Sequence, residues 1–302
     1  MPLPALLLPN TNWERLSFPR LCGLLAERPT KLSQAMHNAA FRELGLPFSY
    51  VAFDTSDTAA AIAAMRVLGI RGLSLTIPHK ERAMSLVDTM SDEAKQIGAI
   101  NTVINTGNEL CGENTDWRGI VRALAETERS FAGGSALVVG AGGAAAAAVF
   151  ALKALNFGTI AVTNRTAARA DELAKAQGVG ALPYAELGRV SADSLTLLVN
   201  ATPIGSHLAA DADFGFDFSS RQPAEVVFDM VTRETPLIVH SRTAGAKVVS
   251  GLRMLLHQAA DQFQLFSELV APLDEMERAL YGQAGQTLPL PARDRAVLKS
   301  PQ

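Results

Sequence analysis

The sequence contains little cysteine, little charge and no long hydrophobic run. Its 302 residues include two cysteines, too few for a disulfide framework. Charged residues make up 19% and the net charge is -3, which excludes the basic footprint of a nucleic-acid-binding protein or a polybasic membrane patch. The longest apolar stretch, "GAAAAAVFAL", is too short to span a bilayer, and "MPLPALLLPNTNWER" lacks the basic region of a signal peptide. We therefore expect a cytoplasmic protein with neither a nucleic-acid nor a membrane partner.

Residues that commonly bind metals are equally scarce. No two of the five histidines have the H-x-x-x-H spacing of a zinc-binding helix. A zinc dehydrogenase would also need clustered cysteines, which two distant ones do not provide. We therefore expect no metal site. The histidines are His37, His79, His207, His240 and His257.

Strand-like and helix-like segments alternate along most of the sequence. A chain of 302 residues that is 48% hydrophobic is large enough for two domains. The alternation is typical of parallel sheets wound with helices. The strand-like segments are 22–26, 47–54, 72–78, 100–105, 109–114, 135–142, 159–164, 195–202, 226–230 and 247–251, and the helix-like ones 33–44, 58–68, 166–177 and 252–269.

A glycine-rich turn, "VVGAGGAAAAA" (138–148), ends one strand-like segment and opens a helix. Gly140, Gly142 and Ala145 fit the G-x-G-x-x-G/A fingerprint of dinucleotide-binding domains. The first glycine allows the tight turn, the second lets a pyrophosphate approach the backbone, and the helix N-terminus faces the anion. A purely structural turn of alanine and glycine would show the same letters. The strand before it and the helix after it favour the dinucleotide site.

The end of the next strand indicates which cofactor binds. An NAD site needs an acidic residue there for the ribose hydroxyl. The sequence instead has Asn164 and Arg165, and Arg169 follows four residues later on the same helix face. Two guanidinium groups can clamp a 2′-phosphate, and Thr166 can cap the helix and donate to the phosphate. The alternative is two solvated arginines. The pattern predicts NADP.

The predicted fold is therefore α/β with two domains. An N-terminal α/β substrate domain with a mostly parallel sheet covers residues 1–116. A Rossmann-type NADP-binding domain covers 117–251. The long C-terminal helix is expected to return to the first domain, which residues 252–302 then complete. The tail from 285 to 302 carries three prolines and indicates a loose extension or a packed arm.

Lys80 stands in an unusual position. The strand-like run "LSLTI" (73–77) ends at Pro78, and Lys80 follows on a helix's first turn, where a cation is mildly disfavoured. Asp116 ends "NTD" just before the predicted crossover between domains, where substrates of two-domain enzymes bind. A lysine oriented by an aspartate could act as a general acid/base. A surface lysine and a turn aspartate are the alternative. His79 could also be an acid/base, or have a helix-cap or solvent role.

With these pieces in place, the sequence resembles the shikimate dehydrogenase family over nearly its whole length. Eight blocks in the same order carry the resemblance: "SLTIPHK" (74–80), "GAINTV" (98–103), "GENTD" (112–116), "GAGGAA" (140–145), "NRT" (164–166), "NATPIG" (200–205), "FDM" (228–230) and "GLRMLLHQA" (251–259). The resemblance implies an NADP-linked oxidation of a ring hydroxyl on a cyclohexene carboxylate, or the reverse reduction. The partner is then a small carboxylated polyol, and the protein a monomer or homodimer.

The resemblance also implies roles for single residues. Lys80 and Asp116 fall on the catalytic pair. Thr76, Asn101 and Gln258 fall on positions that bind the substrate hydroxyls. The implied cofactor-binding residues are Gly140, Ala141, Gly142, Gly143, Ala144, Asn164, Arg165, Thr166, Arg169, Thr202, Pro203 and Gly251, with Asn200 in the same loop as Thr202.

The sequence departs from the family pattern near the substrate carboxylate. Typical members have S-x-S-P before the first helix, whereas here Lys31 takes the first serine position and Ser33 the second. Lys31 either binds the carboxylate or points to solvent, with Thr30 and Ser33 replacing the pair. Trp117 and Thr232 also replace a typical glycine and tyrosine. The substrate therefore stays open between shikimate, quinate and an amino-shikimate analogue. A catalytically weak NADP-binding sensor is the alternative of another class.

Overall fold

The computed structural model describes residues 20–190, 195–209 and 224–287, which fall into two compact units. The first unit holds the described residues of 1–89, 102–111 and 259–302, and the second those of 90–101 and 112–258. Helix α9 (Gly251–Ser267) therefore begins in the second unit and ends in the first. The roles predicted for residues 1–116 and 117–251 stay predictions, and most of the tail at 285–302 lies outside the described residues.

The first unit contains β1, β2, β3 and β5 of a mixed six-stranded sheet with the order β2-β1-β3-β5-β6-β4. Strands β4 and β6 of this sheet lie at the boundary between the two units in sequence. Strand β1 pairs in parallel with β2 and β3, while β3 and β5 are antiparallel. Strands β5 and β6, which correspond to the strand-like segments 100–105 and 109–114, are neighbours in this sheet. The strands are β1 (Arg20–Ala26), β2 (Phe48–Asp54), β3 (Gly72–Leu75), β4 (Thr89–Met90), β5 (Thr102–Asn105) and β6 (Leu110–Glu113).

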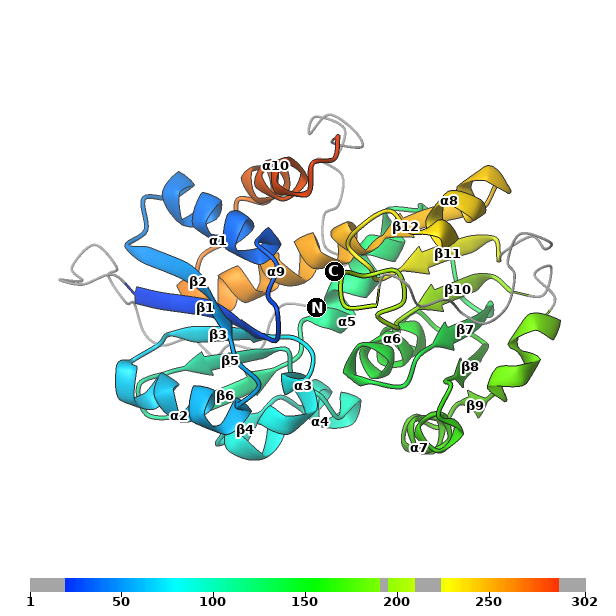
Figure 1. Cartoon of the computed structure of the whole chain (residues 1–302), viewed down its shortest axis with the longest axis horizontal. Helices are drawn as coiled ribbons and strands as arrows, with labels where there is room; N and C mark the ends of the chain where they lie inside the picture. The colour runs from blue at the N-terminus through cyan, green and yellow to red at the C-terminus, as the bar shows by residue number, and fades with distance from the viewer. Residues whose placement is uncertain (1–19, 191–194, 210–223, 288–302) are drawn as a thin grey trace. The chain divides into compact units, whose positions relative to one another are not determined.

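Helices cover both faces of this sheet within the first unit. α1 (Leu32–Glu43) packs against α10 (Leu273–Ala284) on one face, and α2 (Thr58–Leu68) lies on the other (Figure 1). Asp57 caps α2 by accepting from the Ala60 N–H, and Gly69 ends it at a φ of 63°. Two short helices follow β3, namely α3 (His79–Arg82) and η2 (Ala83–Leu86). The sequence did not predict α10.

The second unit contains an all-parallel six-stranded sheet in the order β12-β11-β10-β7-β8-β9. This sheet confirms the predicted Rossmann-type domain. Its strands are β7 (Ser135–Val139), β8 (Thr159–Thr163), β9 (Gly180–Ala181), β10 (Leu197–Asn200), β11 (Val226–Asp229) and β12 (Lys247–Ser250). The helices are α4 (Asp92–Ile97), α5 (Asp116–Ala125), α6 (Gly143–Ala154), α7 (Ala167–Gln177), η3 (Tyr184–Arg189) and α8 (Pro236–Thr243).

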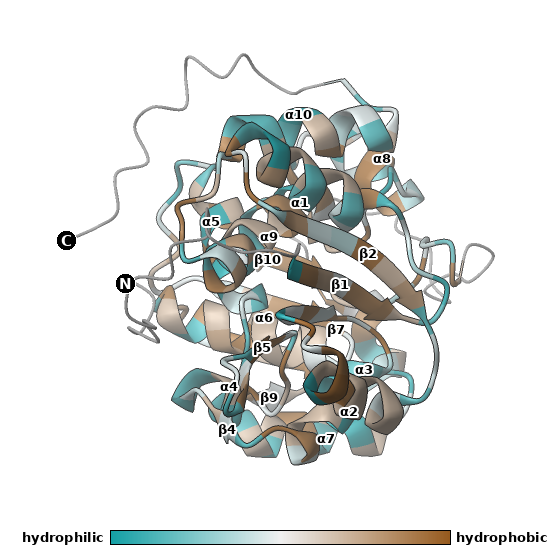
Figure 2. Ribbon diagram, turned by 90° about the vertical axis from the view of Figure 1, so that its left-hand side faces the viewer, coloured by the Kyte–Doolittle hydropathy of each residue, from teal (hydrophilic) through white to brown (hydrophobic). Residues whose placement is uncertain are grey.

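Alternate residues of β7, β8, β10 and β11 pack into two separate hydrophobic cores. In β7, Ala136 and Val138 face α5, α6 and α7, whereas Leu137 and Val139 face η3 and α8. Burial on both faces explains why these strands read as continuous apolar runs. In Figure 2 the strands β1 and β2 are mostly in the hydrophobic colour, and α10 carries hydrophilic residues.

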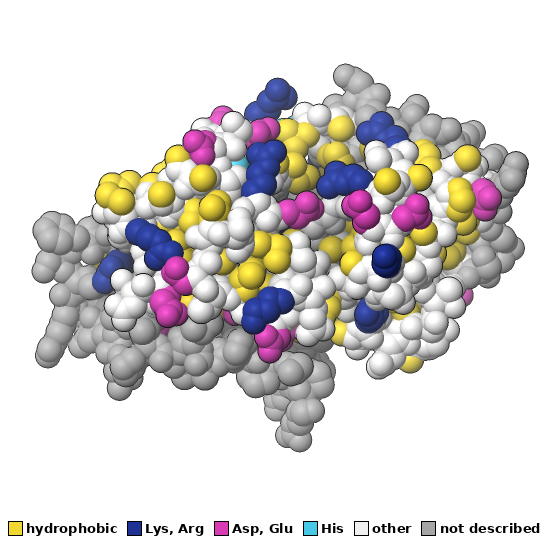
Figure 3. Space-filling view, turned by 90° about the horizontal axis from the view of Figure 1, so that it is seen from below, with side chains coloured by type: hydrophobic (Ala, Val, Ile, Leu, Met, Phe, Trp, Pro, Cys, Tyr) yellow, Lys and Arg dark blue, Asp and Glu magenta, His cyan; other side chains and the backbone are white. Residues whose placement is uncertain are grey.

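The charges on the surface and the composition of the helices match what the sequence indicates. Basic and acidic side chains are interspersed on the face shown in Figure 3. Among the described residues, no helix has both the length and the apolar composition that a membrane span requires. Cys22 and Cys111 are buried free thiols.

Candidate active site

Four buried polar side chains of the second unit form one hydrogen-bonded cluster around Asn101. Its Nδ2 donates to Asp116 Oδ1 at 2.9 Å, to Thr115 Oγ1 at 2.9 Å and to Gln258 Oε1 at 3.1 Å. The Thr115 N–H returns a bond to Asn101 Oδ1 at 2.8 Å. Three side chains predicted separately from the sequence, those of Asn101, Asp116 and Gln258, therefore lie together.

Local backbone geometry fixes the aspartate of this cluster. Asp116 is the first residue of α5, where unpaired N–H groups and the helix dipole favour an anion. Its N–H donates to Asn114 Oδ1 at 3.0 Å, and Asn114 Nδ2 donates to the Ala99 carbonyl at 2.8 Å. The "NTD" turn is thus held by its own side chains. Thr115 was not predicted as a site residue, and its position next to Asp116 was the available signal.

Lys80 and Thr76 lie in the first unit, at the end of β3. Lys80 is half-buried on the first turn of α3, as predicted. The Thr76 N–H donates to the Leu25 carbonyl at 3.2 Å, and its carbonyl accepts from the His79 N–H at 2.8 Å. The His79 side chain is fully buried and its Nδ1 lies 2.8 Å from Thr58 Oγ1. A solvent role for His79 is therefore wrong, because its ring is enclosed beside α2.

The two candidate carboxylate-binding residues occupy different environments at the start of α1. Lys31 is exposed immediately before the helix, whereas Ser33 is buried on its first turn. Asn38 ties this helix to β2 because its side chain bonds both the N–H and the carbonyl of Tyr50, each at 2.8 Å. The start of α1 is therefore held in register with the sheet.

The glycine-rich turn has the backbone geometry expected of a dinucleotide loop. Gly140 has a φ of 126°, a conformation that side chains rarely adopt. A Cβ at this position would lie 3.0 Å from the Ala201 carbonyl oxygen and 3.4 Å from Thr202 Cγ2. Residues 141–144 are half-buried, and α6 begins at Gly143. The structure thus places the predicted glycine turn beside the predicted Thr202 loop.

A buried carboxylate organises the Thr202 loop. Asn200 Oδ1 accepts from the N–H and hydroxyl of Thr202, at 3.0 and 2.6 Å. Asn200 Nδ2 donates to Asp229 Oδ1 at 2.9 Å, and Thr235 Oγ1 donates to Asp229 Oδ2 at 2.6 Å. Burial raises the pKa of Asp229, against the lowering effect of these hydrogen bonds. Pro203 follows on the exposed side of the loop. Asp229, the aspartate of "FDM", was not predicted as a site residue.

The predicted phosphate-binding residues lie where β8 ends and α7 begins. Arg165 and Arg169 are both exposed, and Thr166 occupies the N-cap position of α7. Asn164 Nδ2 donates to the Thr166 carbonyl at 3.1 Å, which holds the turn. Gly251 opens α9, where a Cβ would lie 2.4 Å from the Met230 carbonyl oxygen.

Across the part of the chain that the structure describes, no three His, Cys, Asp or Glu side chains gather to hold a metal ion.

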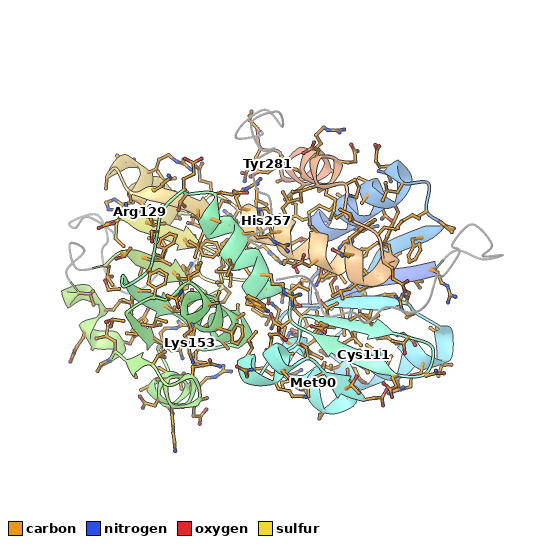
Figure 4. The ribbon with its side chains drawn as sticks, turned by 180° about the vertical axis from the view of Figure 1, so that it is seen from behind. Met90, Cys111, Arg129, Lys153, His257 and Tyr281 are labelled. Carbon is orange, nitrogen blue, oxygen red and sulfur yellow. The ribbon has the colours of Figure 1, made fainter. Side chains whose placement is uncertain are left out.

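A charged cluster joins the end of α5 to the start of α9. Glu126 accepts from Arg253 through both carboxylate oxygens and lies 2.8 Å from His257 Nε2 (Figure 4 labels His257). Burial would raise the pKa of Glu126, but bonds from His257 and Arg253 outweigh it and lower the pKa to about 2. His257 of this cluster directly precedes Gln258, so the cluster helps to hold the part of α9 that carries Gln258.

Three family models together match most of the chain. The model described as shikimate dehydrogenase substrate binding domain matches residues 29–103, and shikimate / quinate 5-dehydrogenase matches residues 123–242. The shikimate 5′-dehydrogenase C-terminal domain matches residues 251–281.

Individual relatives match over similar lengths. The chain is 37% identical to the NADP(+) shikimate dehydrogenase of Moorella thermoacetica over 275 residues, which cover 87% of this chain and 93% of that protein. It is 34% identical to shikimate 5-dehydrogenase from Thermus thermophilus, whose crystal structure is in complex with NADP(H) and shikimate. The two structures have a TM-score of 0.77, and the match covers 88% of this chain and 100% of that one. It is 30% identical to quinate dehydrogenase from Corynebacterium glutamicum in complex with NAD, with a TM-score of 0.79, covering 87% and 99%.

Proposed function

Because the chain belongs to the shikimate dehydrogenase family, we propose that it is an NADP-dependent dehydrogenase that interconverts shikimate and 3-dehydroshikimate. The observation that carries this function is the buried cluster in which Asn101 bonds both Asp116 and Gln258. Amides and a carboxylate oriented in this way suit a substrate with several hydroxyl groups. The same unit carries a dinucleotide loop.

Proton transfer is assigned to Lys80 and Asp116. A ring hydroxyl loses its proton as the carbon that bears it loses hydride, so one general base near that oxygen is sufficient. Lys80 takes this proton, and Asp116 orients the lysine. Asn101 holds Asp116 Oδ1 at 2.9 Å, so its amide also fixes the direction of the carboxylate. Residues 1–116 with 252–302 would bind the substrate and 117–251 the cofactor.

Substrate groups are assigned to residues that differ in chemistry. Thr76, Asn101 and Gln258 would bind ring hydroxyls, since hydroxyl and amide groups can both donate and accept. Ser33 and Lys31 would bind the carboxylate. The buried position of Ser33 and the exposed position of Lys31 support a short neutral bond from the serine and a longer-range attraction from the lysine.

The residues of the second unit fit NADP. Gly140 leaves room for close approach to the backbone, and the first turn of α6 offers N–H groups to a pyrophosphate. Arg165, Arg169 and Thr166 would bind the 2′-phosphate, and Thr202 and Pro203 would line the loop beside the cofactor. When bound, NADP accepts or supplies the hydride.

Two alternative functions differ from this one only in the substrate that is oxidised. Similarity to a quinate dehydrogenase supports quinate as a second substrate, and an amino-shikimate analogue is chemically related. A sensor that binds NADP without turnover is a third possibility, but it has no chemical need to keep both Lys80 and Asp116. Purified protein should reduce NADP with shikimate, as followed by NADPH fluorescence, in a panel that includes quinate and an amino analogue. NADP binding without turnover of any of them would instead identify a sensor.

Two further predictions about the protein stay open. Residence in the cytoplasm stays a prediction from the sequence. Light scattering on the purified protein decides between the monomer and the homodimer.

A further inference from the structure

His79 directly precedes Lys80, and its ring is bound inside the first unit. The ring Nδ1 lies 2.8 Å from the Thr58 hydroxyl oxygen, which is hydrogen-bonding distance. His79 has 0% of its surface exposed and Thr58 has 5%. Because Thr58 is the first residue of α2 and His79 is the first residue of α3, this bond joins the beginnings of two helices.

The enclosure of the ring argues against a direct part in the reaction. A proton acceptor must come within hydrogen-bond reach of the reacting hydroxyl, which a ring without exposed surface does not. Burial also lowers the pKa of His79, so the ring is neutral near pH 7 and places no second positive charge beside Lys80. The contact with Thr58 is therefore the feature of this histidine to be explained.

Helix α3 depends on contacts of this kind for its orientation. It has only four residues, His79–Arg82, and its N-cap residue Pro78 provides no side-chain hydrogen bond. A helix of one turn is not stable by itself in water. Lys80 is the second residue of this turn, so the direction in which the lysine leaves the backbone follows the orientation of the turn.

Both ends of the bond between His79 and Thr58 are anchored. On one side, the Asp57 side chain caps the first turn of α2 and so fixes the place of Thr58. On the other side, the His79 N–H donates to the Thr76 carbonyl at 2.8 Å, and the Thr76 N–H donates to a carbonyl of β1 at 3.2 Å. The turn before Lys80 is thus attached to the sheet through its backbone and to α2 through the ring.

We propose that His79 is a positioning residue, which through its bond to Thr58 holds the turn that carries Lys80 in the orientation required for proton transfer. This inference rests on the proposed function, in which Lys80 takes the proton of the ring hydroxyl. A displacement of about 1 Å at a reacting group can lower a rate roughly 100-fold. The bond acts on the rate and not on NADP binding, whose proposed residues all lie in the second unit.

Two single substitutions remove the bond from either side. Thr58→Val replaces the hydroxyl with a methyl group, and His79→Phe replaces the imidazole with a ring that has no nitrogen. Each should lower kcat with shikimate roughly 10- to 100-fold and leave the dissociation constant for NADPH unchanged. Thr58→Ser keeps the hydroxyl and should retain the rate that Thr58→Val loses. Thr106→Val is the matched control, because it removes a threonine hydroxyl that bonds within the exposed turn between β5 and β6.

The double variant separates positioning from stability. A single substitution leaves one buried polar group without its partner, whereas replacing both partners with apolar groups of similar shape can be nearly neutral. Thr58→Val combined with His79→Phe should therefore melt closer to the wild-type temperature than either single variant, yet turn over as slowly. A merely structural role predicts instead that kcat recovers together with the melting temperature.

Lys80→Ala shows whether the bond acts through the lysine. Adding Thr58→Val to Lys80→Ala should lower kcat no further, because the group that the bond positions is already absent. A further loss in that background would overturn the inference. So would a wild-type kcat in either single variant, recovery of kcat in the double variant, or a loss in Thr58→Ser or Thr106→Val equal to that in Thr58→Val.

The failure of this inference and that of the proposed function are distinguishable. Lys80→Ala and the wild type are measured first with shikimate and NADP. Absence of wild-type turnover, or a wild-type rate in Lys80→Ala, would contradict the proposed function. A slow Lys80→Ala together with any of the overturning results contradicts only the role of His79.

Discussion

Gly119 of α5 and Gln258 of α9 approach so closely that a Cβ on Gly119 would lie 2.9 Å from Gln258 Cβ and 2.8 Å from the Met254 carbonyl oxygen. Asp116 lies one turn before Gly119 on the same helix. The contact therefore sets the separation of two helices whose side chains share Asn101 as a hydrogen-bond donor. Glu126 and its partners fix the other end of α5 against the same helix.

Gly119→Ala should lower both turnover and stability. Alanine is intrinsically better in a helix by about 0.5–1 kcal/mol, but the clash with a backbone carbonyl is a case of overpacking, which costs about 1–3 kcal/mol. Displacing Asp116 from Gln258 should reduce kcat/KM by at least roughly tenfold. Gly282→Ala in α10 is the matched control, because nothing lies within 4 Å of its added Cβ. It should raise the melting temperature, and equal effects of the two substitutions would contradict this account.

Lys80→Ala should remove most turnover and leave NADP affinity nearly unchanged. Losing a general acid/base typically costs roughly 10²–10⁴ in rate. Steady-state kinetics with shikimate and a fluorescence titration with NADPH measure the two quantities. Lys95→Ala, which removes an exposed lysine from α4, serves as the control and should behave like the wild type. A wild-type rate in Lys80→Ala would disprove the assignment.

Asp116→Asn should also lose activity, and its combination with Lys80→Ala should be far from additive. Groups that act as one unit lose nearly the full effect when either is removed. The double variant should therefore be about as slow as the slower single variant. Additive losses would show that the two residues act independently.

The native protein should prefer NADP to NAD. Removing both Arg165 and Arg169 should weaken NADP binding by about 3–6 kcal/mol, since charge-assisted hydrogen bonds are worth about 1.5–3 kcal/mol each. NAD affinity should barely change because NAD has no 2′-phosphate. Arg242→Ala removes an exposed arginine of α8 in the same unit and should leave both affinities unchanged. Equal dissociation constants of the native protein for NAD and NADP would refute the preference.

Local patterns in the sequence were sufficient for most of the fold. The run "SALVVGAG" predicted β7 because strands buried on both faces are continuously apolar, and the turn after it needs glycine for steric reasons. Helix α10 was missed although Leu273, Met276 and Leu280 recur at helical spacing, so the signal was present in the sequence. Its identity depends on packing against α1, which is distant in sequence.

Individual residues of the site could be predicted from the sequence, but their hydrogen-bond partners could not. Asn101 was found by its resemblance to a family position, whereas Thr115 and Gln258 became its neighbours only through folding, since Gln258 is 157 residues away. The hydrogen bonds from Tyr50 to Ser74 and from Ser74 to Gln262 likewise join three segments that no local pattern relates. Tyr50, Ser74 and Gln262 each have an ordinary role in a strand or helix as well, so the sequence alone did not single them out.

Stability should fall as the pH drops below about 6.5. Burial lowers the pKa of His37 to about 3, and burial also lowers that of His257. Between the folded pKa and the unfolded value near 6.5, the unfolded chain binds a proton that the folded chain does not, so acid favours unfolding. The melting temperature should therefore decrease between pH 7 and pH 4. His37→Phe should flatten this slope, while His207→Phe, at an exposed side chain, should not. A slope unchanged by His37→Phe would contradict the prediction.

Lys31 lies exposed immediately before α1, at a position where the family pattern has a serine. An ammonium attracts a carboxylate without the fixed geometry of a hydroxyl pair, so we expect a carboxylate to be essential and the ring to be less strictly selected. Lys31→Ala should raise the KM for shikimate at low ionic strength, and the rise should shrink as salt screens the charge over about 10 Å at 0.1 M. Arg42→Ala, which removes a cation from the far end of the same helix, is the control and should leave the KM unchanged. A KM for Lys31→Ala equal to that of the wild type at low salt would mean that the lysine points to solvent and that Ser33 binds the carboxylate without it.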